Sequence, residues 1–269
     1  QDQGLGSALA VAAAAQSAGG KAATLVLERL RVDTIDDALV HADEGVRVAA
    51  LKLCCQIAAV VPRRKPSNSS LNANSLLPVL QRRLRYCVYG IGAHGVSRQR
   101  HDDCINAIGL LLRQFHCTVM DRSNETHLLD LKPAVLEWAT TVAKWCRWLR
   151  TWLFACLCPG APFPRVSLTL AILHEHARLF WRANQGPPTE NSDSECPRAR
   201  LLAIVCGQRS GKTVRYELDA LCLLLESTYP RIRELAYLVL LQLDVSVRVP
   251  HSPSVAERGY QLMSSLRLR

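Results

Sequence analysis

Residues 132–158 read KPAVLEWATTVAKWCRWLRTWLFACLC, and this stretch decides the fold class. Its apolar side chains recur at alternating intervals of three and four residues, which places them on one face of an α-helix. A coiled coil is one explanation, but over so few heptads we favour the inner face of a long helix in a bundle or solenoid. Trp148 lies off this face, where it could be exposed. The apolar positions are Val135, Trp138, Val142, Trp145, Leu149, Trp152 and Cys156.

The same spacing predicts further helices on both sides of this stretch. Asp43 is a candidate N-cap for the first of them. The proline-rich segment 159–164 ends the long helix, because proline lacks an amide donor and disfavours helical conformation in the residue before it. We therefore expect an all-α fold. The further helices cover about residues 44–60, 74–92, 102–117, 164–180, 215–226 and 231–243.

The chain divides into three parts by composition. Residues 1–20 are Ala-rich and are expected to be poorly ordered, whereas residues 21–249 carry the predicted helices. Within them, residues 184–198 (NQGPPTENSDSECPR) show no apolar period and predict a mobile loop. Residues 250–269 are ambiguous and could begin a further helix. The first residue is Gln1 and the last residues form no finishing element, so we expect a fragment of a larger protein.

Three predicted helices begin with a similar local pattern, led by Arg47, Arg165 and Arg233. In HEAT-type repeats, an arginine near the start of the second helix bonds an acidic turn residue, and small residues let neighbouring helices approach. Asp43 lies one turn before Arg47 and fits that acidic position. The pattern predicts a HEAT/armadillo-like helical solenoid. The three starts are irregularly spaced, which leaves a convolved single α-domain as the alternative.

The chain is basic and rich in cysteine. It has 269 residues, 49% of them hydrophobic, and its 33 Lys and Arg against 23 Asp and Glu give a net charge of +10. Such a charge attracts polyanions such as RNA, unless the balancing acidic residues lie elsewhere in a longer protein. Several of the 11 cysteines occupy apolar helix positions, where free cysteine acts as a small buried hydrophobe. A reducing, cytoplasmic compartment fits best, and no membrane span is visible.

Two basic clusters are the candidate RNA-binding residues. Cations at such positions neutralise phosphates and give binding that depends on salt but not on sequence. The alternative interpretation is that the two clusters bind no RNA and are a loop and a helix face exposed to solvent. The first cluster is Arg63, Arg64 and Lys65 in a loop, and the second is Arg82, Arg83 and Arg85 on the next helix.

Three blocks of sequence resemble successive blocks of the thyroid adenoma-associated (THADA) family. They are residues 38–51 (ALVHADEGVRVAAL), 158–165 (CPGAPFPR) and 229–243 (YPRIRELAYLVLLQL), and they occur in the family's order. The resemblance spans roughly residues 25–245. The arginine-rich RRSAG-type motif of the family is absent from these residues, so no functional residue is carried over from it.

The resemblance implies a large armadillo-like protein that does not itself catalyse a reaction. Its fungal counterpart assists a ribose 2′-O-methyltransferase that acts on the tRNA anticodon loop. The implied partners are therefore this methyltransferase, which carries the S-adenosylmethionine, and tRNA. A scaffold that binds only proteins is the alternative, since some THADA members are linked to membrane calcium transport.

Other chemistry suggested by the sequence is not expected to be present. Residues 207–213 (GQRSGKT) follow an apolar run, but they have three residues before the GK pair where a P-loop has four. His174 and His176 are two positions apart on a predicted helix and point to different sides, unlike the i, i+4 pair of a zinc site. We expect no cofactor, no metal and no small-molecule substrate.

Overall fold

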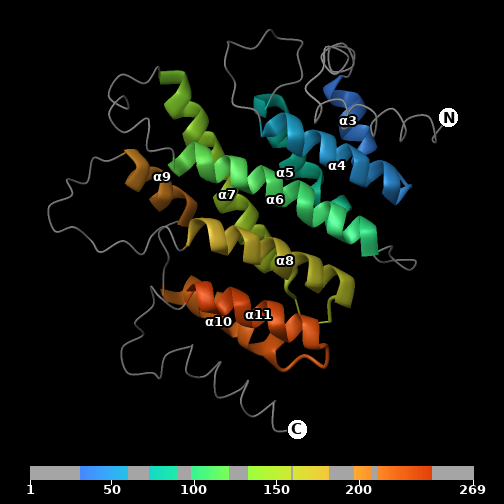
Figure 1. The fold of residues 1–269 in the computed structure, drawn as a ribbon, viewed down its shortest axis with the longest axis vertical. Helices are drawn as coiled ribbons and strands as arrows, with labels where there is room; N and C mark the ends of the chain where they lie inside the picture. The colour runs from blue at the N-terminus through green and yellow to red at the C-terminus, as the bar shows by residue number, and fades with distance from the viewer. Residues whose placement is uncertain are drawn as a thin grey trace, which may run out of the picture. The chain divides into compact units, whose positions relative to one another are not determined.

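The computed structural model describes the chain in seven ranges: 31–59, 73–89, 98–120, 133–158, 160–181, 197–206 and 211–243 (Figure 1). Every regular element within these ranges is an α-helix, which confirms the predicted all-α class. None of these helices is long and apolar enough to cross a membrane. The chain forms two compact units, Gln1–Thr118 and Val119–Arg269, which are described separately.

The first unit is built around the packing of α4 on α5, with α3 in contact with both helices. The Asp43 carboxylate caps α4 by accepting from the amides of Gly45 and Val46, at 2.6 and 3.2 Å, as expected from the sequence. Ion pairs join α6 to α4: one links Arg100 to Glu44 (3.0 Å), and another links Lys52 to Asp103 (2.8 Å). The helices are α3 (Val32–Ala38), α4 (Glu44–Ala58), α5 (Ala73–Tyr89) and α6 (Arg98–Met120), the last of which continues beyond this unit.

The core of the first unit is formed by the apolar faces that helical spacing predicts. Leu77, Leu80, Leu84 and Cys87 of α5 are all buried. Helical spacing in α6 predicts a buried stripe of Ile105, Ile108, Leu112 and Phe115; Ile105 is only half-buried, and the other three are buried. The fully buried side chains include Leu51, Leu53, Leu76, Leu80, Ile108 and Phe115.

The second unit consists of five helices in the described ranges. α8 packs against both α7 and α11, α9 packs against α7, and α10 pairs with α11. Figure 1 shows α10 and α11 as the two red helices that follow each other along the chain. The helices are α7 (Pro133–Cys156), α8 (Phe163–Phe180), α9 (Pro197–Cys206), α10 (Gly211–Leu225) and α11 (Pro230–Leu243).

The long α7 buries the face that its sequence predicts. Trp138, Val142, Trp145, Leu149 and Cys156 are buried there, whereas the side chain of Val135 lies outside the described residues. The ring centroids of Trp148 and Trp152 are 5.9 Å apart and their planes are nearly parallel, at 13°. Both rings are half-buried, so Trp148 is shielded by its neighbours rather than fully exposed.

Two short helices are present that the apolar period did not predict, α3 and α9. Pro197 and Arg198 were expected in the mobile loop, but they are the first residues of α9. Proline is tolerated in the first turn of a helix, because an amide at that position would have no hydrogen-bond partner within the helix. The rest of that loop, residues 184–196, lies outside the described residues, as do residues 1–20 and 250–269.

Candidate functional site

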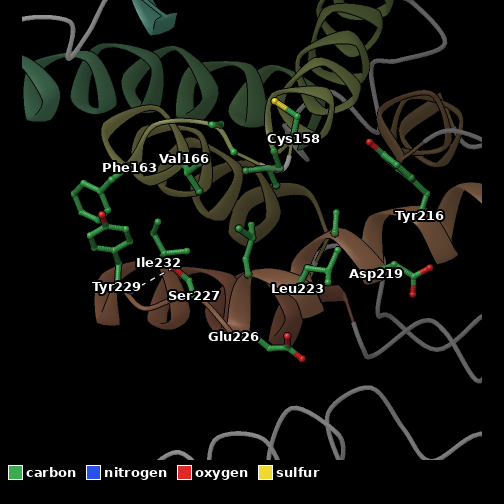
Figure 2. Close-up of a pocket in the computed structure, with 15 residues that line it drawn as sticks. Cys158, Phe163, Val166, Tyr216, Asp219, Leu223, Glu226, Ser227, Tyr229 and Ile232 are labelled. Carbon is green, nitrogen blue, oxygen red and sulfur yellow. Dashed lines mark hydrogen bonds between the residues drawn. The ribbon is translucent and has the colours of Figure 1, made fainter.

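An open pocket of about 560 Å³ lies in the second unit, between the start of α8 and the pair α10 and α11 (Figure 2). Its walls come from three segments: residues 157–166, the outer side of α10, and the turn that leads into α11. In Figure 2, Val166 and Ile232 lie opposite one another near the end of the pocket where Phe163 and Tyr229 meet, and both are buried. A volume of this size lies in the range of pockets that hold a drug-sized ligand or a few side chains of a partner.

A tight turn and an aromatic pair close one end of the pocket. Gly160 has φ of 79°, a conformation that L side chains rarely adopt, and it lets the chain reverse between α7 and α8. The reversal places Phe163 at the first position of α8, where its ring centroid lies 4.7 Å from that of Tyr229. Two inter-helix turns, far apart in sequence, therefore meet at this end.

Exposed large apolar side chains are concentrated at this pocket. Eight are exposed in the described part of the chain, and four of them line the pocket. Their exposed fractions are 37% for Phe163, 59% for Tyr216, 62% for Leu223 and 51% for Tyr229. Exposed apolar groups that cluster in this way mark interaction sites more often than scattered ones do.

The charged groups among the described residues that line the pocket are acidic. Asp219 and Glu226 of the α10 side are exposed, and no Lys, Arg or His is among the described residues that line it. The remaining polar groups are Ser227, whose hydroxyl accepts from the Tyr229 amide at 3.3 Å, and the exposed thiol of Cys158.

Arg82 and Arg83 of the predicted second basic cluster are paired with one carboxylate. Arg83 donates through Nε and Nη2 to the two oxygens of Asp36, at 2.8 and 2.7 Å, and Arg82 donates to Oδ1 at 3.0 Å. These hydrogen bonds lower the pKa of Asp36 to about 2, and the bond from Arg83 has the largest effect. Arg85 is exposed and lies over the Tyr86 ring, 4.9 Å from its centroid.

The structure thus separates the six predicted RNA-binding residues into three groups. Arg82 and Arg83 share the single negative charge of Asp36, so these three side chains together keep one positive charge. Arg85 is exposed and has no acidic partner among the described residues. The loop residues Arg63, Arg64 and Lys65 lie outside the described residues.

The repeat arginines use backbone carbonyls as acceptors. Arg47 donates to the carbonyls of His41 and Ala42, at 2.6 and 2.8 Å, rather than to Asp43, whose carboxylate is occupied by the helix cap. Arg233 donates to the Ser227 carbonyl at 2.7 Å. The prediction that the arginine bonds an acidic turn residue is therefore wrong for these two helices. Arg47 and Arg233 bond backbone carbonyls of the turn before their helix instead.

Two of the three helix starts share one geometry. Arg47 and Arg233 are each the fourth residue of their helix, and each bonds the carbonyl of the residue six positions earlier. Arg165 is the third residue of α8 and donates to the Cys158 thiol at 3.7 Å, while Pro159, six positions before it, lies outside the described residues.

The P-loop interpretation does not fit the structure. A P-loop follows a β-strand, but the apolar run 201–206 belongs to helix α9. Residues 207–210 lie outside the described residues. In the described part, no group of three or more His, Cys, Asp or Glu is placed to hold a metal ion.

Several predicted core positions carry cysteine or histidine. His176 is buried, with Nε2 3.0 Å from the Cys146 carbonyl oxygen, and His174 is half-buried. The thiols of Cys87, Cys104 and Cys146 are buried, and burial raises their pKa, for Cys87 to about 12. These thiols are packing groups, because a thiol with so high a pKa is not a nucleophile at neutral pH.

Comparison with known sequences identifies no family for this chain. No protein-family model matches the chain, and no curated protein matches it significantly.

The pocket residues were not singled out from the sequence. A signal for them exists: Tyr216, Ala220 and Leu223 follow helical spacing on the side of α10 opposite to the buried Leu218, Leu221 and Leu225. A helix with two apolar faces packs inward with one and offers the other to a ligand or partner.

Proposed function

We propose that this chain is a non-catalytic helical scaffold of HEAT/armadillo type that works by binding a partner protein. The observation that carries the proposal is the pocket of the second unit, where Phe163, Tyr216, Leu223 and Tyr229 expose apolar surface together. Burial of such a surface by a partner is favourable in proportion to the apolar area removed from water.

The shared turn geometry supports a repeat architecture. The pairs α3–α4 and α10–α11 each consist of a helix, a short turn and a second helix whose fourth residue is an arginine bonded to that turn. Solenoids are built by stacking units of this kind, each of which buries its apolar face against its neighbours.

The resemblance to the THADA family suggests the partner. On that basis we propose a cytoplasmic complex with a tRNA ribose 2′-O-methyltransferase, in which the methyltransferase binds S-adenosylmethionine and catalyses transfer of the methyl group. The scaffold would hold the enzyme, and the net charge of +10 would favour an RNA substrate nearby.

A second basic and aromatic surface supports contact with RNA. Lys144 and Arg147 are exposed on α7, next to Trp148, whose ring stacks on that of Trp152. Nucleic-acid surfaces combine cations for the phosphates with aromatic rings for the bases in this way. Arg85 adds an exposed charge on α5.

A reconstituted methylation assay tests the proposal. The chain is added to the tRNA 2′-O-methyltransferase of the same organism, with tRNA and S-adenosylmethionine, and anticodon-loop ribose methylation is measured. We expect the chain to co-purify with the enzyme and to raise the rate of methylation above that of the enzyme alone. An enzyme that neither binds the chain nor responds to it contradicts the tRNA role.

A tRNA-binding experiment separates this proposal from a scaffold that binds only proteins. Reversal of Arg63, Arg64, Lys65 and Arg85 to Glu should weaken tRNA binding and flatten its salt dependence. The control reverses Arg98, which is 96% exposed. Affinity for tRNA that is absent, or unchanged by the four reversals while a protein partner is still bound, favours the protein-only scaffold.

A further inference from the structure

The positive charge of the chain is concentrated in one segment. Residues 45–101 contain ten Lys and Arg and no Asp or Glu, so this segment alone accounts for the net charge of +10. The rest of the chain is balanced, with the other 23 of the 33 Lys and Arg against all 23 Asp and Glu. An asymmetry of this kind within one chain is typical of a segment that contacts a polyanion.

Most of the described cations of this segment on α4 and α6 are already paired. Lys52, Arg98 and Arg100 each lie within ion-pair distance of a carboxylate from outside the segment, and Arg47 bonds backbone carbonyls. On α5 the balance is different, because Asp36 is the one carboxylate among the described residues that pairs with its three arginines. The described excess of positive charge therefore lies on α5.

The segments on either side of α5 add no negative charge. Residues 60–72 and 90–97 lie outside the described residues, but their sequences contain no Asp or Glu, and the first of them contains three cations. On α3, which packs against α5, Asp33 pairs with Arg31 at 3.7 Å and Asp37 is exposed. The excess of positive charge on α5 thus does not depend on where its two flanking segments lie.

Arg82, Arg85 and Tyr86 form one exposed face of α5. Positions i, i+3 and i+4 lie on the same side of a helix, and all three side chains are exposed, whereas Leu84 and Cys87 between and beside them are buried. The side chain of Arg82 is 58% exposed and, among the described residues, donates one hydrogen bond, to the Asp36 carboxylate. A guanidinium group has five N–H donors, so Arg82 keeps donors for a ligand.

Arg85 and Tyr86 form an exposed stacked pair on this face. The Arg85 Cζ atom lies 4.9 Å from the centroid of the Tyr86 ring, and Nη2 donates to the Tyr86 hydroxyl at 3.0 Å. Tyr86 is 38% exposed. Unpaired bases stack on aromatic rings and on guanidinium planes, while the N–H groups at the edge of a guanidinium bind phosphates. An acidic peptide would use only the charges, and a duplex keeps its bases stacked inside.

We propose that the face of α5 formed by Arg82, Arg85 and Tyr86 binds an unpaired stretch of RNA, with its phosphates on the two guanidinium groups and a base stacked on the Arg85–Tyr86 pair. This rests on the RNA contact in the proposed function, which it extends by naming the surface and the class of RNA. Asp36 is a positioning residue here, because it holds Arg82 through one donor and leaves the others to the ligand.

The binding test uses the full chain and labelled anions. The probe is a fluorescein-labelled single strand of about twelve uridines, and the comparisons are an RNA duplex of the same length and a labelled polyglutamate of the same charge. Fluorescence anisotropy should show binding of the single strand that weakens as salt is added, and binding of polyglutamate that is about tenfold or more weaker. Equal affinity for the single strand and polyglutamate would indicate an acidic protein as the ligand and overturn the proposal.

Variants of exposed residues place the RNA on α5. Arg82→Gln and Arg85→Gln should each reduce the slope of log affinity against log salt concentration by about 0.7, as for one lost phosphate contact with a single strand. Tyr86→Ser should weaken binding of the single strand by about tenfold and leave duplex binding unchanged, whereas Tyr86→Phe keeps the ring and should bind like the wild type. The control is Arg231→Gln, since Arg231 is 56% exposed and paired with a carboxylate, like Arg82, but lies outside residues 45–101.

The outcomes are distinguishable from those of the methylation assay. Unchanged salt slopes in Arg82→Gln and Arg85→Gln, or an equal change in the control, overturn α5 as the RNA site. Circular dichroism confirms that each variant keeps its helices, so that a loss of binding is not a loss of fold. A chain that binds the single strand through α5 without raising methylation keeps this RNA site and loses only the methyltransferase role. A chain that raises methylation while the α5 variants bind RNA like the wild type keeps the proposed function and loses this site.

Discussion

Arg150 of α7 and Glu217 of α10 form an ion pair inside the second unit, with side chains that are only 5% and 6% exposed. The guanidinium also donates to the Cys206 carbonyl at the end of α9, at 2.9 Å. Its Cζ lies 4.9 Å from the ring centroid of Trp181, which directly follows α8. One buried cation on α7 therefore contacts three other parts of the unit.

Removal of one partner of this pair should destabilise the second unit strongly. We expect Glu217→Leu to lower the free energy of unfolding by about 3–5 kcal/mol, because it leaves the Arg150 charge buried without its partner. The double variant Arg150→Met with Glu217→Leu should recover much of the loss. Urea denaturation followed by circular dichroism measures both, and Glu234→Leu in the exposed pair with Arg231 is the control. Equal stability of Glu217→Leu and the control would contradict the interpretation.

The pair of Arg83 with Asp36 should make the first unit sensitive to acid. The pKa of Asp36 is lowered to about 2, so the pair stabilises the fold fully above pH 4 and is lost as the pH falls from about 4 to 2. Asp36→Asn should lower the free energy of unfolding by about 1 kcal/mol at neutral pH. The difference between variant and wild type should vanish near pH 2. A difference that stays constant between pH 7 and pH 2 would exclude the carboxylate as its source.

Arg47 should stabilise the turn before α4. Arg47→Met removes the donors to the His41 and Ala42 carbonyls, and we expect a loss of about 1.5–3 kcal/mol, as for hydrogen bonds to charged groups. Arg233→Met should act in the same direction in the second unit and by less, since Arg233 is less buried. Urea denaturation measures both, with Arg98→Met as the control. A loss no larger than that of the control would show that the turn does not depend on this bond.

Thiol reactivity should follow burial. In the folded chain, Cys117 and Cys158 are exposed and should react with a maleimide before Cys54 and Cys87, whose pKa values are raised by burial. Peptide mapping by mass spectrometry after short labelling times identifies the order. Early modification of Cys54 in the native chain would contradict the described core.

Helical spacing predicted the long helices well because each repeats its period several times. The seven-residue α3 and ten-residue α9 contain too few turns for the period to stand out from the surrounding sequence. The cap of Asp43 was also predictable, since it depends on residues next to one another.

Contacts between distant segments could not be predicted in the same way. The pairing of Asp36 with Arg83 joins residues 47 positions apart, so the sequence shows the basic helix face without the carboxylate that offsets part of its charge. The acceptor of Arg47 is a carbonyl, and a residue pattern says nothing about which way a turn directs its carbonyls. The pocket depends on Phe163 meeting Tyr229, a contact that only the packing of α8 on α11 creates.

The buried pair of Arg150 and Glu217 also fixes how α10 is turned about its own axis. Successive residues of a helix are about 100° apart around that axis, so Tyr216 and its neighbour Glu217 cannot face the same side. While Glu217 is held on α7, Tyr216 and Leu223 are directed outward and Leu218 and Leu221 inward. A rotation by about half a turn would exchange the exposed apolar side chains for core side chains, so the identity of the exposed surface is decided by a contact on the hidden side of the same helix.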